Sequence, residues 1–340
     1  MMRFLAALLI VLSWGGAARA ADAPVAARTA VPAHADVAYA PATPSGSRGH
    51  LLDIYLPPKA DKPVPLVIWT SGSAWMADTG KDGAKIMAPA LLDAGFAVAG
   101  VSIRSSTQAR FPAQVHDIKA AIRFLRANAA RYGIDPARIA IMGDSSGGWT
   151  SAMAALTGDA PELEGAIGTT GVSSAVQAAV ALYPPTNFVE MDRWALTKCS
   201  PSTPLPKPGF CHDDPASPES RLVGCAIQTC KDAVLRASPI HYISRADPPL
   251  MILHGRSDGL VPYNQGERLF KALAHACLAA ELYTLPLAPH GPPDGFLQDA
   301  ALQQGASVER SDAKGCKVDL PKIETPGWTP VIAFLKRHLQ

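Results

Sequence analysis

The sequence predicts an α/β fold in which helices cover both faces of a mostly parallel, doubly wound sheet, interrupted by a disulfide-bearing insertion. Short runs rich in β-branched residues alternate along the chain with helical patterns, without an internal repeat. The later runs are continuously apolar, as in strands that are buried on both faces of a parallel sheet. With 48% hydrophobic residues among 340, the chain has enough apolar material for one large core.

The predicted elements follow this alternation from residue 51 onwards. Strands are expected at residues 51–56, 65–69, 97–103, 139–142, 176–182, 250–253 and 281–285. Helices are expected at residues 85–93, 114–132, 146–156, 264–274 and 330–339. The clearest is the helix at 114–132, in which Val115, Ile118 and Ile122 share one face and Gly133 follows the last residue. These elements indicate one domain at residues 48–340.

The first 47 residues read as a targeting segment and a leader. Arg3, the apolar run 4–12 and the small-residue pattern at 18–20 are typical of a secretory signal peptide, with cleavage expected between Ala20 and Ala21. The run is too short to span a bilayer, and no cysteine follows the cleavage site to carry a lipid anchor. A Pro- and Ala-rich leader is expected at 21–47. The protein is therefore expected to be secreted or periplasmic.

The charge balance argues against two classes of partner. The chain carries 31 basic and 29 acidic side chains, which gives a formal net charge of +2. Such a chain has no extended positive field, so we expect neither nucleic acid nor an anionic membrane surface as the partner. A small molecule fits the composition better.

The six cysteines predict disulfides, because an exported protein folds in an oxidising compartment. Short loops favour the pairs Cys199–Cys211 and Cys225–Cys230, which leaves Cys277–Cys316, although the spacing alone does not choose among fifteen connectivities. Zinc is the alternative, but the four-residue gap between Cys225 and Cys230 is not that of a zinc knuckle, and we expect no metal site.

The insertion at residues 183–249 is the second unusual feature. It is longer than a connection between parallel strands requires, it is dense in proline, and it holds four of the six cysteines. A loop of this length in a compact domain is usually a lid or a binding element, and disulfides would limit the entropy lost on ordering it.

The strongest chemical motif is Gly143-Asp144-Ser145-Ser146-Gly147, which lies directly between a predicted strand and a predicted helix. Glycines on both sides of a serine permit a sharp strand-to-helix turn that lifts the hydroxyl clear of the sheet. We therefore expect Ser145 to be a nucleophile.

A serine nucleophile requires an imidazole base and a carboxylate that fixes the imidazole tautomer. Asp258 follows the predicted strand at 250–253, and His290 follows the last predicted strand, so both lie where the nucleophile can be reached and in the order acid before base. His254 precedes the acid and is expected to be structural. Asp294 is a weaker rival acid because it follows the base.

Several of these segments resemble those of one family. The chain resembles the α/β-hydrolase superfamily, and more narrowly the bacterial carboxylesterases grouped with bifunctional feruloyl and acetyl xylan esterases, in residues 71–75, 111–117, 132–136, 143–147, 258–262 and 212–220. The likeness runs from about residue 37 to the C-terminus. It implies ester hydrolysis by Ser145, Asp258 and His290, without a cofactor, on a small-molecule, polysaccharide-linked or polymer-linked ester.

One segment departs from the pattern of these relatives. A His-Gly-Gly-Gly run is usual where this chain has Ser71-Gly72-Ser73-Ala74. We expect the backbone N–H groups of Gly72, Ser73 and Ser146 to form the oxyanion hole, and Trp75, Trp149 and Trp194 are candidates for an aromatic acyl pocket.

Two other functions remain open at this stage. A secreted amidase or peptidase would use the same residues, because only the leaving group differs. The alternative from another class is a non-catalytic binding protein that keeps the fold. The departure of residues 71–74 from the His-Gly-Gly-Gly pattern is the observation that favours it.

Overall fold

The computed structural model describes residues 28–58, 62–204 and 207–339. The predicted signal peptide at 1–20 therefore lies outside the described residues. Within those ranges, no helix combines the length and apolar character needed to cross a membrane.

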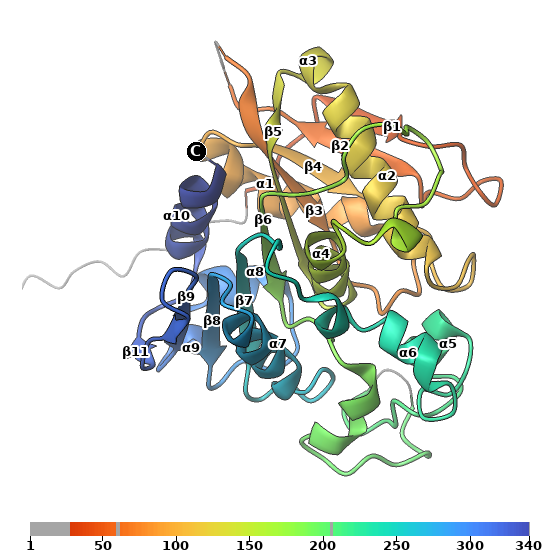
Figure 1. The fold of residues 1–340 in the computed structure, drawn as a ribbon, viewed down its shortest axis with the longest axis vertical. Helices are drawn as coiled ribbons and strands as arrows, with labels where there is room; N and C mark the ends of the chain where they lie inside the picture. The colour runs from red at the N-terminus through yellow and green to blue at the C-terminus, as the bar shows by residue number, and fades with distance from the viewer. Residues whose placement is uncertain (1–27, 59–61, 205–206, 340) are drawn as a thin grey trace, which may run out of the picture.

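The described residues form one eleven-stranded sheet in the order β1-β2-β4-β3-β5-β6-β7-β8-β9-β10, with β11 paired to β9 (Figure 1). The strands are β1 (His34–Ala38), β2 (Leu51–Tyr55), β3 (Val64–Thr70), β4 (Ala97–Val101), β5 (Ile134–Asp144), β6 (Ala178–Leu182), β7 (Leu250–Gly255), β8 (Ala280–Leu285), β9 (Ser307–Asp312), β10 (Lys317–Val318) and β11 (Lys322–Ile323). The central strands from β4 to β8 are parallel, and the outer pairs are antiparallel. The predicted fold class is confirmed.

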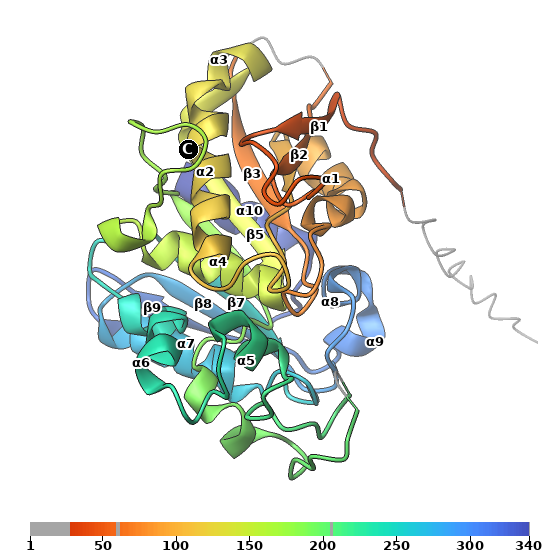
Figure 2. The same cartoon turned by 90° about the vertical axis from the view of Figure 1, so that its right-hand side faces the viewer.

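Helices cover both faces of this sheet, as Figure 2 shows, with α2 in front of the strands and α10 behind them. The α-helices are α1 (Ala84–Asp93), α2 (Ala113–Ala127), α3 (Ala129–Tyr132), α4 (Ser146–Leu156), α5 (Pro218–Val223), α6 (Lys231–Arg236), α7 (Asn264–His275), α8 (Pro293–Gln298), α9 (Ala300–Gln303) and α10 (Trp328–Leu339). Short 3-10 helices lie at Gly80–Gly83, Pro161–Leu163, Phe188–Glu190, Asp192–Trp194 and Pro239–Tyr242. Ile122 of α2 and Leu269 of α7 pack in the core on one face, and Met87 of α1 and Phe334 of α10 pack on the other.

Three features differ from the sequence expectations. The leader at 21–47 contains β1, which pairs antiparallel with β2. The strand at 281–285 is not the last, because β9, β10 and β11 follow it and extend the sheet. The predicted helix at 114–132 breaks at Asn128, whose backbone leaves the helical region, so it forms α2 and α3 instead.

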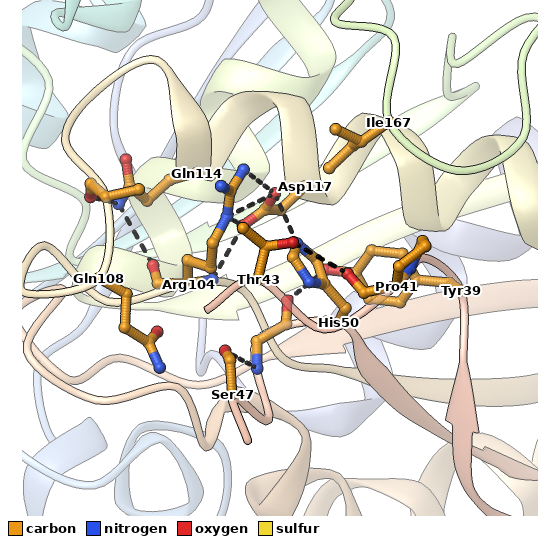
Figure 3. Close-up of polar contacts among 12 residues, drawn as sticks. Tyr39, Pro41, Thr43, Ser47, His50, Arg104, Gln108, Gln114, Asp117 and Ile167 are labelled. Atoms are coloured by element: carbon orange, nitrogen blue, oxygen red, sulfur yellow. Dashed lines mark hydrogen bonds and ion pairs between the residues drawn. The ribbon is translucent and has the colours of Figure 1, made fainter. Parts of the chain in front are cut away.

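A buried carboxylate ties the start of the chain to α2 (Figure 3). Asp117 of α2 accepts two hydrogen bonds from the Arg104 guanidinium, at 2.6 Å from Nη2 and 2.9 Å from Nε, and its Oδ1 lies 3.2 Å from His50 Nε2. The Tyr39 hydroxyl donates to the carbonyls of Gly49 and Ser102. The motif at residues 111–117 thus supplies an anchor for the loop that follows β4 and for the segment before β2.

The insertion runs from the end of β6 to the start of β7 and carries α5 and α6 at one end of the sheet (Figure 1). Disulfides join Cys199 to Cys211 and Cys225 to Cys230 within it. The third bridge joins Cys277, just after α7, to Cys316, between β9 and β10. The first two pairs are those that short loops favour, and the third is the pair that remains.

Candidate active site

The serine motif forms a tight turn at the carboxyl end of β5. Ser145 has φ 53° and ψ −123°, in a region that residues with a side chain rarely adopt, and α4 begins at the next residue. A Cβ added to Gly147 would lie 2.1 Å from the Thr70 carbonyl oxygen, so this position has no room for a side chain. The strained turn projects the Ser145 side chain away from the sheet, as a nucleophile elbow requires.

Ser145, His290 and Asp258 form a continuous hydrogen-bonded chain. His290 Nε2 lies 3.1 Å from Ser145 Oγ, and His290 Nδ1 lies 2.8 Å from Asp258 Oδ2. The three residues follow the ends of β5, β8 and β7, so the parallel sheet brings them to one edge. This arrangement fits a nucleophile, a base and an acid in the predicted order. The rival Asp294 lies in the first turn of α8, and it is Asp258 that contacts His290.

The Asp258 carboxylate is fully buried and has several donors. Its Oδ1 accepts hydrogen bonds from the N–H groups of Leu260 and Val261, at 2.9 and 2.8 Å. Burial alone would raise the pKa of Asp258, but hydrogen bonds with His254 and His290 outweigh it and hold the pKa far below its usual range. The group is therefore a carboxylate at any pH near neutrality.

His254 supports this acid, a role that the sequence did not indicate. It is buried at the end of β7, its Nε2 lies 3.0 Å from the Val261 carbonyl, and the same atom lies 3.6 Å from Asp258 Oδ2. Because a carbonyl only accepts, Nε2 carries the proton. His254 thus helps to fix the loop that presents the acid.

Tyr183, directly after β6, holds the loop that carries the base. Its hydroxyl donates to the Gly291 carbonyl and lies 3.4 Å from Asp144 Oδ2, and its ring packs edge-on against His290 at 4.7 Å between centroids. Burial raises the pKa of Tyr183 well above its usual value, with the nearby carboxylates adding to the shift, so the hydroxyl stays protonated and able to donate. The position just after a buried parallel strand is the sequence signal that could have identified this residue.

The loop after β3 faces Ser145, and two of its predicted oxyanion donors already have partners. The Gly72 N–H donates to Asp144 Oδ1 at 2.9 Å, and the Ser73 N–H donates to the Ser146 hydroxyl at 2.9 Å. Burial raises the pKa of Asp144 despite the hydrogen bond from Gly72. Among the described residues, the N–H groups of Ala74 and Ser146 have no hydrogen-bond partner. Both residues line the cavity over Ser145, so their N–H groups are candidate oxyanion donors.

A cavity of about 320 Å³ opens over Ser145. Its walls come from the loop after β3, the elbow, the His290 loop, the Asp258 loop and the insertion. Of the three candidate tryptophans, Trp75 lines it, whereas Trp149 is fully buried beneath it with its indole N–H on the Ala237 carbonyl, and Trp194 is not part of the wall. The expectation that Trp149 and Trp194 line the pocket is wrong, because α4 and the insertion direct them elsewhere. Trp149 instead packs edge-on against Trp75 and supports that wall.

The insertion contributes two polar side chains to the same cavity, His212 and Glu219. Both belong to the segment 212–220 that resembles the carboxylesterases, but the sequence alone assigns neither side chain a role. In the parts of the chain that the structure describes, no group of three or more His, Cys, Asp or Glu side chains is arranged to hold a metal ion.

The sheet order, the elbow and the placement of the three residues define an α/β-hydrolase. The family model described as BD-FAE matches residues 52–273, which is more than half of the chain. The chain therefore belongs to the BD-FAE family.

Named relatives and solved structures of similar proteins are esterases. The chain is 31% identical over 258 residues to the esterase LipQ of Mycobacterium tuberculosis, covering 75% of this chain and 56% of that protein. It is 28% identical over 253 residues to the isoprenylcysteine alpha-carbonyl methylesterase ICME of Arabidopsis thaliana, covering 73% and 55%. The chain thus spans about half the length of the curated relatives it matches.

Two solved structures match over most of the chain. A truncated form of a carbohydrate esterase from gut microbiota superimposes with a TM-score of 0.71 at 29% identity, covering 93% of this chain and 98% of that one. A bifunctional GH43-CE protein of Bacteroides eggerthii gives a TM-score of 0.70 at 30% identity, covering 90% of this chain and 38% of that one.

Proposed function

We propose that this protein is a carboxylic ester hydrolase that works through an acyl-enzyme on Ser145. The observation that carries the proposal is the hydrogen-bonded chain from Ser145 through His290 to the buried Asp258 carboxylate, of which Ser145 and His290 line a cavity. The esterase activity named for its relatives supports the same reaction.

In the first step, Ser145 Oγ attacks the ester carbonyl carbon while His290 Nε2 accepts the hydroxyl proton. Asp258 holds the Nδ1 proton and stabilises the imidazolium. His290 then returns the proton to the leaving alcohol as the C–O bond breaks. A water molecule, activated by His290 in the same way, attacks the acyl-enzyme and releases the acid.

Backbone N–H groups hold the negative oxygen of each tetrahedral intermediate. The Ser146 N–H, at the start of α4, supplies one donor, and the loop at residues 72–74 supplies the other. Within that loop, the N–H groups of Gly72 and Ser73 can serve only if they leave Asp144 and the Ser146 hydroxyl, whereas the Ala74 N–H has no such bond to lose. The hole can therefore form without the glycine run of the relatives.

The substrate is proposed to be a small or carbohydrate-linked ester, in line with the carbohydrate esterases that this fold resembles. The protein is proposed to act in the periplasm or outside the cell. Three disulfides favour an oxidising compartment, and the secretory pattern at residues 1–20 agrees with export.

Labelling with a fluorophosphonate tests the proposal directly. An activated serine should react stoichiometrically, and Ser145→Ala should abolish the label. Initial rates on acetyl, aryl and sugar esters would then identify the substrate class. A folded protein that neither takes up the label nor hydrolyses any ester would instead be a binding protein that retains the fold.

A further inference from the structure

His212 and Glu219 form a buried polar pair in the wall of the catalytic cavity. The two residues are only 3% and 4% exposed, and His212 Nδ1 lies 3.1 Å from Glu219 Oε2. Burying a carboxylate is costly unless a counter-charge and hydrogen bonds compensate for the lost water. The proposed ester chemistry uses neither side chain.

The pair leaves hydrogen-bonding capacity unused. The distance between Nδ1 and Oε2 suits an ion pair, but the approach is off the direction of a hydrogen bond, and neither atom has another partner among the described residues. A native protein rarely leaves a buried carboxylate oxygen unpaired. Glu219 Oε2 itself is cut off from the cavity, but the other oxygen, Oε1, is not among the inaccessible atoms and has no hydrogen bond among the described residues, so a substrate in the cavity can supply its donor.

Three hydrogen bonds and a disulfide hold the backbone around His212 in place. Asp192 accepts hydrogen bonds from the N–H groups of His212 and Asp213 at 2.8 and 2.9 Å, and the Ser217 hydroxyl donates to the His212 carbonyl at 2.6 Å. The preceding residue, Cys211, is bonded to Cys199. Such immobilisation is expected for a group whose position relative to a ligand matters.

The charges of the pair indicate what kind of group it binds. Burial alone would lower the pKa of His212, but the carboxylates of Glu219 and Asp192 outweigh it and raise the pKa above its usual value. The surroundings thus stabilise the imidazolium form relative to a free histidine, and that form balances a carboxylate at 3.1 Å. A neutral hydroxyl donor therefore suits this site better than a cation, which the pair has no net charge to attract.

We propose that Glu219, held by His212, accepts a hydrogen bond from a hydroxyl group of the ester substrate and so gives the enzyme its preference for hydroxylated esters. The inference rests on the proposed esterase function and adds a specificity-determining pair to it. Both residues come from the insertion, whereas Ser145, Asp258 and His290 do not.

The test compares matched esters with and without hydroxyl groups. Glycerol 1-monoacetate and n-propyl acetate share the acyl group and the length of the alcohol, and ethyl 3-hydroxybutyrate and ethyl butyrate place the difference on the acyl side. For each pair, the ratio of kcat/KM values is measured in the wild type and in Glu219→Gln. A hydrogen bond to a charged acceptor predicts that at least one ratio falls about tenfold or more in the variant.

Two further variants separate recognition from folding. His212→Gln, which leaves the carboxylate in place without its counter-charge, should lower the same ratio by a smaller factor. Glu162→Gln makes the same change at an exposed position of the 3-10 helix Pro161–Leu163 and should leave both ratios at their wild-type values. The proposal is overturned if a folded Glu219→Gln variant keeps the wild-type ratios or loses rate equally on all four esters. If Glu219→Gln does not fold, wild-type ratios in His212→Gln overturn it instead.

The wild-type rates distinguish failure of this inference from failure of the proposed function. A protein that hydrolyses all four esters without preferring the hydroxylated members is an esterase without this subsite. A protein that hydrolyses none and resists the fluorophosphonate is not an esterase, and the subsite then has no substrate to bind.

Discussion

Replacing Asp258 by Asn should remove most of the activity while leaving the fold intact. In the wild type, Oδ1 accepts two backbone N–H groups, from Leu260 and Val261, and Oδ2 accepts from His290 Nδ1. An asparagine side chain keeps its oxygen on the two N–H groups, because the reverse orientation would set its NH₂ against both of them. The NH₂ group then faces His290.

This orientation changes the tautomer of the base. An NH₂ donor opposite Nδ1 requires Nδ1 to be the acceptor, so the imidazole proton moves to Nε2, where it points at Ser145 and cannot remove its proton. We expect kcat/KM to fall by about 10³–10⁴, as the loss of tautomer control does in a serine triad. That loss corresponds to about 4–5.5 kcal/mol of transition-state stabilisation.

Initial rates on 4-nitrophenyl acetate provide the assay, with circular dichroism to establish that the variant is folded. Asp294→Asn is the matched control, because it makes the same change in the first turn of α8 and should stay within about threefold of the wild type. An Asp258→Asn variant that retains more than a tenth of the wild-type rate would show that Asp258 does not govern His290.

Ser145→Ala and His290→Ala should each lower kcat by a similar large factor, with the double variant little slower, since the two groups act as one unit; steady-state rates of all three variants check this. Gly147→Ala should lower the free energy of unfolding by about 1–3 kcal/mol or more in urea titrations, because its Cβ would lie 2.1 Å from a backbone oxygen. Gly158→Ala, whose Cβ would meet nothing closer than 3.8 Å, should change that free energy by less than about 0.5 kcal/mol. Opening the bridge beside the cavity with Cys199→Ser should raise KM for esters at temperatures well below the unfolding midpoint. If KM rises only at the temperatures at which the variant unfolds, the insertion has no separate role in binding.

The sequence was most informative where the signal is local or periodic. The predicted helix at 146–156 has the bounds of α4, because the glycines of the elbow mark its start and its second half, residues 152–156, consists of strong helix formers. The central strands were recognisable because burial on both faces makes them continuously apolar. In contrast, β9 is a partly exposed strand near the edge with the polar sequence SVERSD, which carries little strand signal.

In the candidate site too, some residues were predictable from the sequence and others were not. Ser145, Asp258 and His290 follow strand ends, so topology and chain order predict their meeting. The contacts of Asp144 with Gly72, and of His212 with Glu219, depend on how long loops fold, which no local pattern encodes. For Trp194 the sequence predicted a contact with the cavity that the structure does not have, because an aromatic residue in a predicted lid need not face the cavity.

The position of the insertion has a consequence for how proteins with this fold change over evolutionary time. The reacting groups are carried by the ends of β5, β7 and β8, whereas one wall of the cavity is carried by a separate stretch of chain between β6 and β7. Residues of that stretch can be exchanged, lengthened or shortened without altering the strands that align nucleophile, base and acid. Substitutions within the insertion can therefore change which substrates fit the cavity. Its internal bridges Cys199–Cys211 and Cys225–Cys230 limit the conformational entropy that an altered insertion loses on folding.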